Sequence, residues 1–251
     1  MIKFFRKIRY NLMEQNKTGK YLKYAIGEII LVMIGILLAL QVNNWNQERL
    51  NQQRVEGYLK SLVEDLNSDI VQYSFNIKSY AQDLENNKMV LKNGAYKIFE
   101  TDSIVKLVFG YYQLDRTSSH TYERIKNAGL IESLGTEEIN KALNDYYNLE
   151  LPYYQGMLEW DKHYNDKDSD FWSYNDNFET GSIRNYGTNS LSYNDSPTKR
   201  KGDLIKLIES TQGRNHIRNA IVRHEHTLAK VQELKIKTQK LLDLINLEIA
   251  N

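Results

Sequence analysis

Hydrophobic and polar positions divide the chain into a short apolar part and a long part with helical periodicity. From Ile29 to Leu40 no polar side chain occurs, and the segment from Tyr24 to Val42 is long enough to cross about 30 Å of hydrocarbon at about 1.5 Å per residue. Ten Leu, Ile and Val side chains between Ile26 and Leu40 contribute about −3 to −6 kcal/mol to insertion, which outweighs one acidic residue near the end of the run. We therefore predict a transmembrane helix over residues 24–45.

A cleavable signal peptide is the alternative interpretation of this apolar run, because such peptides have hydrophobic regions of similar length. The residues after Leu40, however, are Gln-Val-Asn-Asn-Trp and contain no small-x-small cleavage site. Tyr21, Tyr24 and Trp45 flank the run as aromatic residues do at membrane interfaces. These features favour an anchor that is retained.

The charges on either side of the anchor predict its orientation. Residues 1–23 carry seven basic side chains and one acidic side chain, a net charge of +6, whereas residues 46–251 have a net charge of −4. By the positive-inside rule, the N-terminus lies in the cytoplasm and residues 46–251 form an extracytoplasmic domain. Residues 1–23 also have the pattern of an amphipathic helix on an anionic leaflet, although an ordinary anchor flank looks the same. Membrane lipid is the expected partner of residues 1–45.

Glu28 lies inside the apolar run and shares one helix face with Gly35 and Ala39. A small-xxx-small pair of this kind allows two transmembrane helices to approach closely. One interpretation is that Glu28, Gly35 and Ala39 form an interface with a neighbouring helix, in a homo-oligomer or with a partner protein. The other is that the Glu28 carboxylate snorkels to the cytoplasmic interface.

Two long hydrophobic stripes predict that the extracytoplasmic domain is built on two long helices. Steps of mostly three or four residues separate their members, which indicates helices with one buried face. The first helix should continue from the anchor as a stalk to about Asn93, where Gly94 ends it, and the second should return antiparallel to it. The stripes consist of Leu59, Leu62, Leu66, Ile70, Tyr73, Ile77, Tyr80, Leu84 and Leu91, and of Ile217, Ile221, Leu228, Val231, Leu234, Thr238, Leu241, Ile245 and Ile249.

Shorter helical patterns occupy residues 102–113, 118–130 and 136–150. Thr136 is the predicted N-cap of the third pattern, and Pro152 is expected to break or kink the chain after it. The predicted fold class is therefore all-α, with a transmembrane helix that continues into a long stalk helix, packed antiparallel with a long C-terminal helix and accompanied by several shorter helices.

An irregular loop over about residues 173–202 is predicted from its Asn, Gly, Ser, Tyr and Asp composition, and loops of this length are usually functional or disordered. The overlapping region 146–193 contains eight Tyr, two Trp and two Phe residues. Most of these aromatic side chains should pack shorter helices against the long pair. The four expected to contact a partner or ligand are Trp172, Tyr174, Tyr186 and Tyr193.

Two groups of residues invite a metal interpretation, and neither supports one. Asp166, Asp168 and Asp170 alternate as in a calcium loop, but Phe171 and Asn177 stand where that loop needs Gly and Glu. A solvated acidic loop is the expectation. His216, His224, Glu225 and His226 have the wrong spacing for shared ligation on one helix face, so ordinary surface or interface histidines are expected.

Composition and motifs exclude several classes of function. The chain has no Cys, which excludes disulfides, Cys-ligated metals and thiol nucleophiles. No phosphate loop, nucleophile elbow, zinc-protease motif or dinucleotide fingerprint occurs, so we expect no enzyme and no cofactor. The formal net charge of +1, with the basic excess confined to residues 1–23, gives no support for nucleic acid as a partner.

The first 50 residues resemble the start of a family of uncharacterised single-span inner-membrane proteins of Gram-negative bacteria, a domain of unknown function. The similarity is weaker over residues 121–131 and 142–147, where Ile125 replaces a usual Leu. It implies a periplasmic helical domain and supplies no catalytic residues. The segments that carry it are Ile2-Lys-Phe-Phe-Arg-Lys-Ile-Arg, Lys20-Tyr-Leu-Lys-Tyr-Ala-Ile-Gly-Glu-Ile-Ile-Leu-Val and Ile34-Gly-Ile-Leu-Leu-Ala-Leu-Gln-Val-Asn-Asn-Trp-Asn.

The sequence thus leads to a membrane-anchored helical domain that acts non-catalytically, with a protein partner in the cell envelope or as a homo-oligomer. A ligand-binding sensor that uses the aromatic region 146–193 is the second hypothesis. The identity of the partner or ligand does not follow from the sequence.

Overall fold

Helix α2, Thr18–Lys92, is a single uninterrupted helix in the computed structural model, which describes residues 10, 18–92, 94–180 and 192–250. The described residues contain helices and no strand, so the all-α prediction is confirmed. The chain divides into two units, residues 1–57 and 58–251, and α2 contributes to both. Of the predicted segment 1–23, only residues 10 and 18–23 are described.

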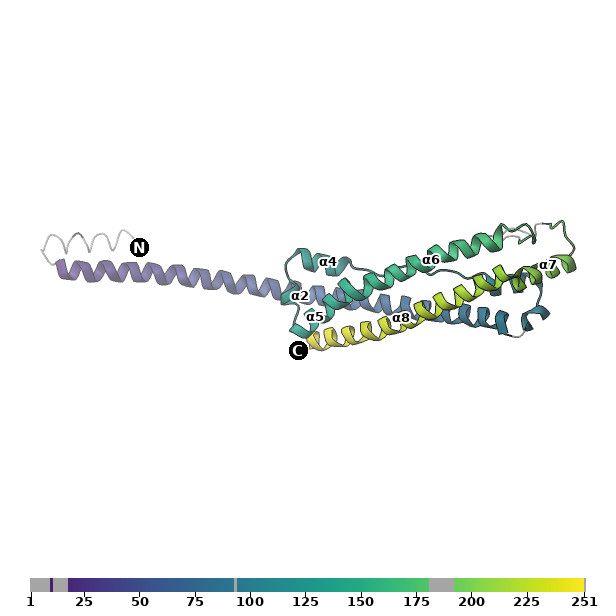
Figure 1. Cartoon of the computed structure of the whole chain (residues 1–251). Helices are drawn as coiled ribbons and strands as arrows, with labels where there is room; N and C mark the ends of the chain where they lie inside the picture. Colours follow the sequence, from purple (N-terminus) through teal and green to yellow (C-terminus); the bar gives the residue numbers. More distant parts are fainter. Residues whose placement is uncertain (1–9, 11–17, 93, 181–191, 251) are drawn as a thin grey trace. The chain divides into compact units, whose positions relative to one another are not determined.

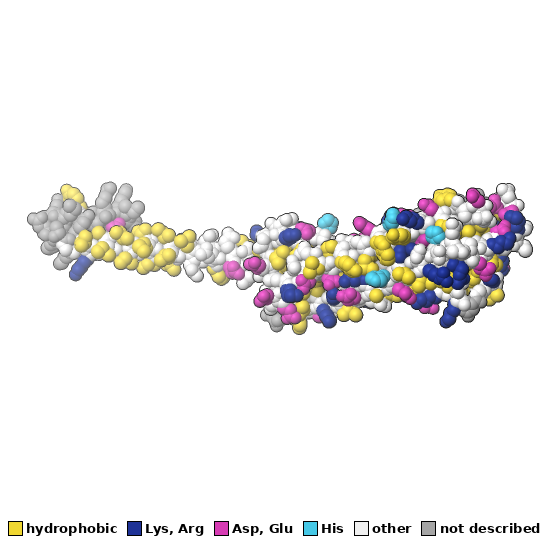
Figure 2. Space-filling model, viewed as in Figure 1, with side chains coloured by type: hydrophobic (Ala, Val, Ile, Leu, Met, Phe, Trp, Pro, Cys, Tyr) yellow, Lys and Arg dark blue, Asp and Glu magenta, His cyan; other side chains and the backbone are white. Residues whose placement is uncertain are grey.

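In the first unit, α2 carries the apolar run. Every side chain from Ile29 to Leu40 is exposed, and Figure 2 shows hydrophobic side chains covering this part of the helix. Within the described residues, α2 is the one helix that is long and apolar enough to span a membrane.

In the second unit, the same helix is buried along one face by steps of three and four residues. Leu59, Leu62 and Leu66 begin this face, and the series continues through polar residues to Asn87 and Val90. Gly94, with a φ of 64°, follows the end of α2 and leads into the 3₁₀ turn η1, Ala95–Ile98. The prediction that α2 continues from the apolar run and stops near Gly94 is confirmed.

Two further long helices, α6 (Leu151–Ser173) and α8 (Thr211–Ala250), pack with α2 in the second unit. Side-chain contacts pair Tyr73 with Tyr154 and Tyr80 with Asp161, so α6 runs parallel to α2. On α8, Arg223 contacts Asp161 and the earlier residue His216 contacts the later residue Asp168. Helix α8 therefore runs antiparallel to α6 and α2 (Figure 1). The predicted return of the final helix is confirmed.

The shorter elements are α3 (Thr101–Val108), α4 (His120–Asn127), the 3₁₀ turn η2 (Ile131–Ser133), α5 (Glu137–Asp145), the π-helical turn η3 (Tyr146–Glu150) and α7 (Pro197–Glu209). Thr136 caps α5 by accepting a hydrogen bond from the backbone N–H of Ile139 at 3.3 Å, as predicted. The predicted break at Pro152 is wrong, because the chain stays helical from α5 through η3 into α6. Pro152 lies in the first turn of α6 and follows the wider π turn, where its missing N–H is tolerated.

Apolar residues fill both ends of the second unit and leave a polar middle. At the end where α7 lies, the core consists of Val90, Tyr96, Ile104, Val105, Val108, Phe109, Trp172, Phe178, Leu204, Leu207, Ile208 and Ile217. At the end where α4 and α5 lie (Figure 1), buried apolar residues include Leu59, Leu62, Leu66, Ile125, Leu134, Ile139, Leu143, Leu241, Leu242 and Ile245.

Candidate functional site

Arg223 joins two acidic residues in the middle of the second unit. Asp161 and Asp168 lie two turns apart on one face of α6 and point toward α8. The Arg223 side chain, 4% exposed, donates from Nε to Asp161 at 3.2 Å and from Nη2 to Asp168 at 2.5 Å. The planar guanidinium can bridge two carboxylates in this way, whereas an ammonium group is a single point charge.

Neighbouring polar side chains surround this ion pair, although Arg223 Nη1 has no hydrogen-bond partner among the described residues. The Tyr80 hydroxyl donates to Asp161 at 2.9 Å, and His216 Nδ1 lies 2.6 Å from Asp168 while its ring stacks on Phe171. His224 is completely buried, with Nε2 3.8 Å from Asp161. Burial lowers the pKa of His224, so its imidazole is neutral at pH 7.

A second group of hydrogen bonds involves residues of α2 that precede Tyr80. The Tyr146 hydroxyl donates to Asp69 at 2.6 Å, and because it has one proton to give, the Tyr73 hydroxyl at 2.8 Å must donate to Tyr146. One turn on, the Asn76 amide donates to the Tyr154 hydroxyl at 2.7 Å. Burial raises the pKa of Asp69 to about 6, since no cation lies beside it to offset the loss of water.

These residues form one continuous buried polar layer between the two apolar cores. The polar layer consists of Asp69, Tyr73, Asn76, Tyr80, Tyr146, Tyr154, Asp161, Asp168, Arg223 and His224. Helices α2, α6 and α8 and the turn η3 supply it at positions where a helical bundle ordinarily has hydrophobic side chains. Burying charges costs free energy unless they are paired and hydrogen-bonded, so the layer depends on its complete set of partners.

The segment between α3 and α4, residues 109–119, lies over the polar layer and is here named the strap. It has no regular secondary structure, and α2 supplies hydrogen-bond partners for it. The backbone N–H of Ser118 donates to Asp69 at 3.4 Å, that of Tyr111 donates to Asp83, and the Gln113 side chain donates to Ser79 at 2.9 Å. The predicted helix 102–113 therefore ends five residues early, because α2 side chains satisfy the backbone of the extended chain.

The model of one protein family matches residues 28–209 of the chain, which includes the α2 and α6 parts of the polar layer. The chain belongs to the family of unknown function DUF6090. No curated protein and no solved structure matches it. Arg223 and His224 of this DUF6090 protein lie beyond the matched residues.

The partner-contact residues predicted for the DUF6090 chain have different environments. Trp172 is 2% exposed and belongs to the apolar core near α7, so its prediction as a contact residue is wrong. The composition of its neighbours is that of a loop, whereas α6 continues to Ser173 and carries the indole inward. Tyr174 is 83% exposed, Tyr193 is covered by the Arg200 guanidinium at 3.6 Å from its ring centre, and Tyr186 lies outside the described residues.

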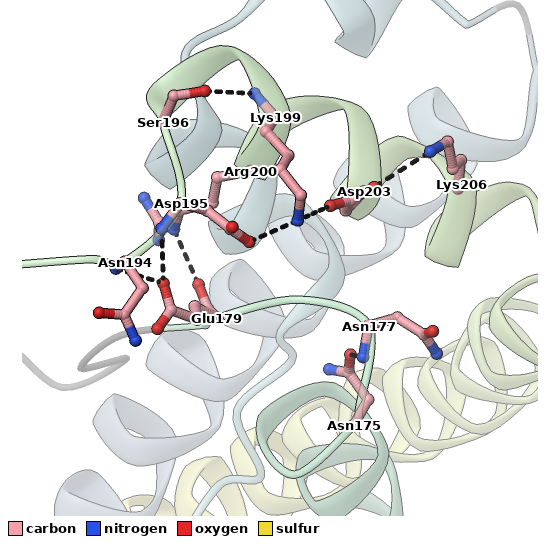
Figure 3. A network of polar contacts seen from close by, with 10 residues as sticks. All are labelled: Asn175, Asn177, Glu179, Asn194, Asp195, Ser196, Lys199, Arg200, Asp203 and Lys206. Carbon is pink, nitrogen blue, oxygen red and sulfur yellow. Dashed lines mark hydrogen bonds and ion pairs between the residues drawn. The ribbon is translucent and has the colours of Figure 1, made fainter.

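Arg200 and Glu179 fix the described parts of the predicted loop 173–202. Arg200, itself buried, donates to the carbonyl oxygens of Glu179 at 2.8 Å and Thr180 at 3.1 Å. The Glu179 carboxylate accepts from the backbone N–H groups of Asn194 and Asp195, and Figure 3 shows these contacts beside α7. The irregular region is shorter than predicted because Ser196 caps α7, which begins at Pro197.

The acidic and histidine clusters also differ from their predicted environments. Asp166, Asp168 and Asp170 lie on α6 and not in a solvated loop, and Asp168 is paired with Arg223. His224 is a core residue and not a surface residue. Across the residues that the structure describes, no group of three His, Cys, Asp or Glu is placed to hold a metal ion.

Glu28, Gly35 and Ala39 all lie on α2 within the apolar run. Gly35 and Ala39 are exposed, and a Cβ added at Gly35 would meet no atom within 4 Å. Their role as an interface between helices stays a prediction.

Proposed function

We propose that this DUF6090 protein is a single-span inner-membrane protein whose helical domain lies in the periplasm and acts non-catalytically, in a complex with an envelope protein or as a homo-oligomer. The observation that carries the proposal is the continuity of α2. One helix presents an exposed apolar run from Ile29 to Leu40 and then supplies Asp69, Tyr73 and Tyr80 to the polar layer. The apolar run and the domain are therefore joined by one helix.

The charge distribution supports the proposed orientation. Seven basic residues precede the apolar run, and positive residues stay on the cytoplasmic side. The resemblance of the first 50 residues to single-span inner-membrane proteins points the same way. In this arrangement residues 1–45 contact lipid.

The chemistry of the polar layer supports a non-catalytic role. Asp161, Asp168 and Asp69 are each held by donors from the chain itself and are shielded from solvent. A general base must reach the proton of a bound substrate within hydrogen-bond distance. Buried and occupied carboxylates are suited to fixing the alignment of helices.

Cysteine crosslinking in membranes tests the oligomer. The chain contains no Cys, so Ala39→Cys introduces a single thiol on the face that includes Gly35. Leu37→Cys is the matched control, because it lies about 200° around the helix from Ala39. Mild oxidation should give a covalent dimer with A39C and little with L37C. No dimer with either variant, together with a purification that returns the chain alone, would refute the proposal.

Protease treatment of spheroplasts tests the topology. Added protease should digest the domain after residue 46 in intact spheroplasts and leave a short membrane-bound fragment. Full protection of the domain until lysis would contradict the periplasmic assignment.

A ligand-binding sensor is the second candidate, favoured by a cavity of about 520 Å³ beside α7. Its volume is in the range of small-molecule sites, and its lining includes Asp176, Asn177, Asp203, Ser210 and Gln212. This lining favours a polar ligand over one that stacks on aromatic rings. A thermal-shift screen of polar metabolites on the full chain in detergent should find a compound that raises the melting temperature, and Gln212→Ala should abolish that shift. Equal shifts in the variant would exclude this cavity.

A further inference from the structure

The strap is attached to α2 by a series of side-chain contacts and by no backbone ladder. Among the described residues, its backbone–backbone hydrogen bonds are those at its two ends, with α3 and α4. In between, Asp83, Ser79 and Asp69 receive hydrogen bonds from Tyr111, Gln113 and Ser118. Successive contacts along the strap lie at progressively earlier positions of α2, over about four turns. Because none of them is a backbone hydrogen bond of a helix, the strap can separate from α2 without unfolding a helix.

Gly110 is where the strap lies closest to the polar layer. A Cβ at this position would be 3.3 Å from both Asn165 Nδ2 and His224 Cε1. The strap backbone thus packs directly on a buried histidine whose ring nitrogens have no hydrogen-bond partner among the residues that the structure describes. Because Phe109 before it is buried in the apolar core near α7, Gly110 keeps His224 covered when the strap residues after it separate from α2.

Within the described part of the chain, the two carboxylates that hold the strap form no ion pair with a cation. Asp69 is 1% exposed, and Asp83 is half-buried with Oδ2 enclosed and without a partner. Their closest charged neighbours are acids: Asp65 and Asp115 near Asp69, and Asp161 near Asp83. Ionised carboxylates in such surroundings gain free energy by becoming hydrated.

We propose that the strap is a proton-controlled cover, closed over α2 when Asp69 and Asp83 are neutral and released when both are ionised. The proposal concerns the second unit alone and holds whichever membrane topology is correct. It assigns the polar layer a role in sensing acidity in addition to aligning the helices.

Linkage fixes the direction of this response. Burial raises the pKa of Asp69 and of Asp83 from 3.8 to about 6 in the closed state. A released state that hydrates them returns the pKa toward the ordinary value, so protons bind the closed state more tightly. Acidification therefore closes the strap. Between pH 5 and pH 7.5, opening becomes about tenfold more frequent if one carboxylate is hydrated and about a hundredfold if both are.

Other ionisable groups around the two carboxylates do not reverse this sign. Arg223 is committed to Asp161 and Asp168, and His224, whose pKa burial lowers, stays covered by Gly110 in both states. The surrounding tyrosines stay protonated, since burial raises their pKa values further. The groups that face the two carboxylates are Asp65, Tyr73 and Tyr80 on α2, Asp115 on the strap, Tyr146 and Tyr147 on η3, Asp161 on α6, and Arg223 and His224 on α8.

Hydrogen–deuterium exchange of the full chain in detergent tests the proposal. Protection factors, which remove the intrinsic pH dependence of exchange, should fall at least tenfold over residues 107–119 between pH 5 and pH 7.5. Peptides that cover residues 227–245 of α8 should stay equally protected at both pH values. Constant protection of the strap would overturn the proposal, and so would a parallel loss in α8, because that would indicate global unfolding.

Two variants and a control identify the responsible groups. Asp69→Asn and Asp83→Asn keep an acceptor oxygen for the strap and cannot ionise. Each should therefore reduce the pH-dependent change in the strap's protection factor by about tenfold, and the double variant should show no such change. Glu64→Gln changes an exposed acid on the same helix and should leave the response unchanged. A pH response that persists in the double variant would also refute the proposal. If that variant fails to fold, the two single variants and the wild-type chain still decide.

Discussion

Arg223 bridges two buried carboxylates of the polar layer, and its replacement tests whether that layer depends on charge pairing. Arg223→Met keeps most of the hydrophobic volume and removes both hydrogen bonds, to Asp161 at 3.2 Å and to Asp168 at 2.5 Å. Removing one partner of a buried ion pair costs about 3–5 kcal/mol, because the remaining charge is left without compensation. Tyr80 and His216 still hold the two acids, so we expect a loss near the lower end, about 3 kcal/mol.

The assay is urea unfolding of the full chain in detergent, followed by far-ultraviolet circular dichroism. A loss of about 3 kcal/mol is a large part of the total of about 5–15 kcal/mol for a natural domain, and it should lower the melting temperature by about 6–12 °C. Arg218→Met on the exposed face of the same helix is the matched control, with an expected change within about 0.5 kcal/mol.

A rescue experiment separates lost charge pairing from lost packing. If unpaired carboxylates cause the loss, Asp161→Asn and Asp168→Asn added to Arg223→Met should restore more than half of it, since no buried charge remains. Arg223→Lys should recover only part, because one ammonium group cannot bridge both acids. The reasoning is refuted if Arg223→Met costs less than about 1 kcal/mol, or if the triple variant is no more stable than Arg223→Met alone.

Three further predictions concern other positions. Because burial raises the pKa of Asp69 and of Asp83 from an ordinary value of 3.8 to about 6 in the folded chain, the folded state binds more protons. As pH falls from 7.5 to 5, the free energy of unfolding of the wild-type chain should therefore rise by about 2–3 kcal/mol relative to that of the double Asp69→Asn, Asp83→Asn variant, measured by urea unfolding. Gly213→Ala should destabilise the domain by more than about 2 kcal/mol in the same assay, because a Cβ would overlap a backbone carbonyl oxygen of α7, whereas Gly202→Ala, in open space, should be neutral or slightly stabilising. Thr136→Ala removes the cap of α5 and should cost about 1 kcal/mol, measured as a lower melting temperature.

Local signals predicted the parts of the fold that depend on neighbouring residues. The apolar run and the stripe that begins at Leu59 fixed α2 as one helix, and Gly94 marked its end because glycine adopts positive φ without strain. The start of α5 was also predicted from local signals, because a Thr136 hydroxyl followed by two acidic residues favours a helix N-terminus. These features require no knowledge of the tertiary structure.

The features that sequence reasoning missed depend on contacts between distant segments. The strap stays extended because Asp83 and Asp69 accept hydrogen bonds from its backbone N–H groups at Tyr111 and Ser118, which lie 28 and 49 positions later in the chain. Trp172 is buried because residues 151–173, for which no helix was predicted, form α6 and place the indole in a core formed with α3 and α7. A helical pattern in the first case and a composition typical of loops in the second were outweighed by contacts between distant segments.

The polar layer was missed for a different reason, and the sequence did contain a signal for it. The predicted stripe of α2 included hydrophobic positions alone and passed from Leu66 to Ile70 and Tyr73. Steps of three and four from Leu59 lead instead through Asp69 and Asn76, and both are buried. The spacing of a buried helix face is set by geometry and does not depend on whether each position is apolar. A polar residue that falls on this spacing is therefore better interpreted as a buried group that needs a partner than as an interruption of the face. Applied to α6 and α8, the same rule selects Asp161, Asp168 and His224. Residue spacing therefore identifies much of the polar layer, whereas Arg223 lies one position off the series on α8 and is identified only by its contacts with α6.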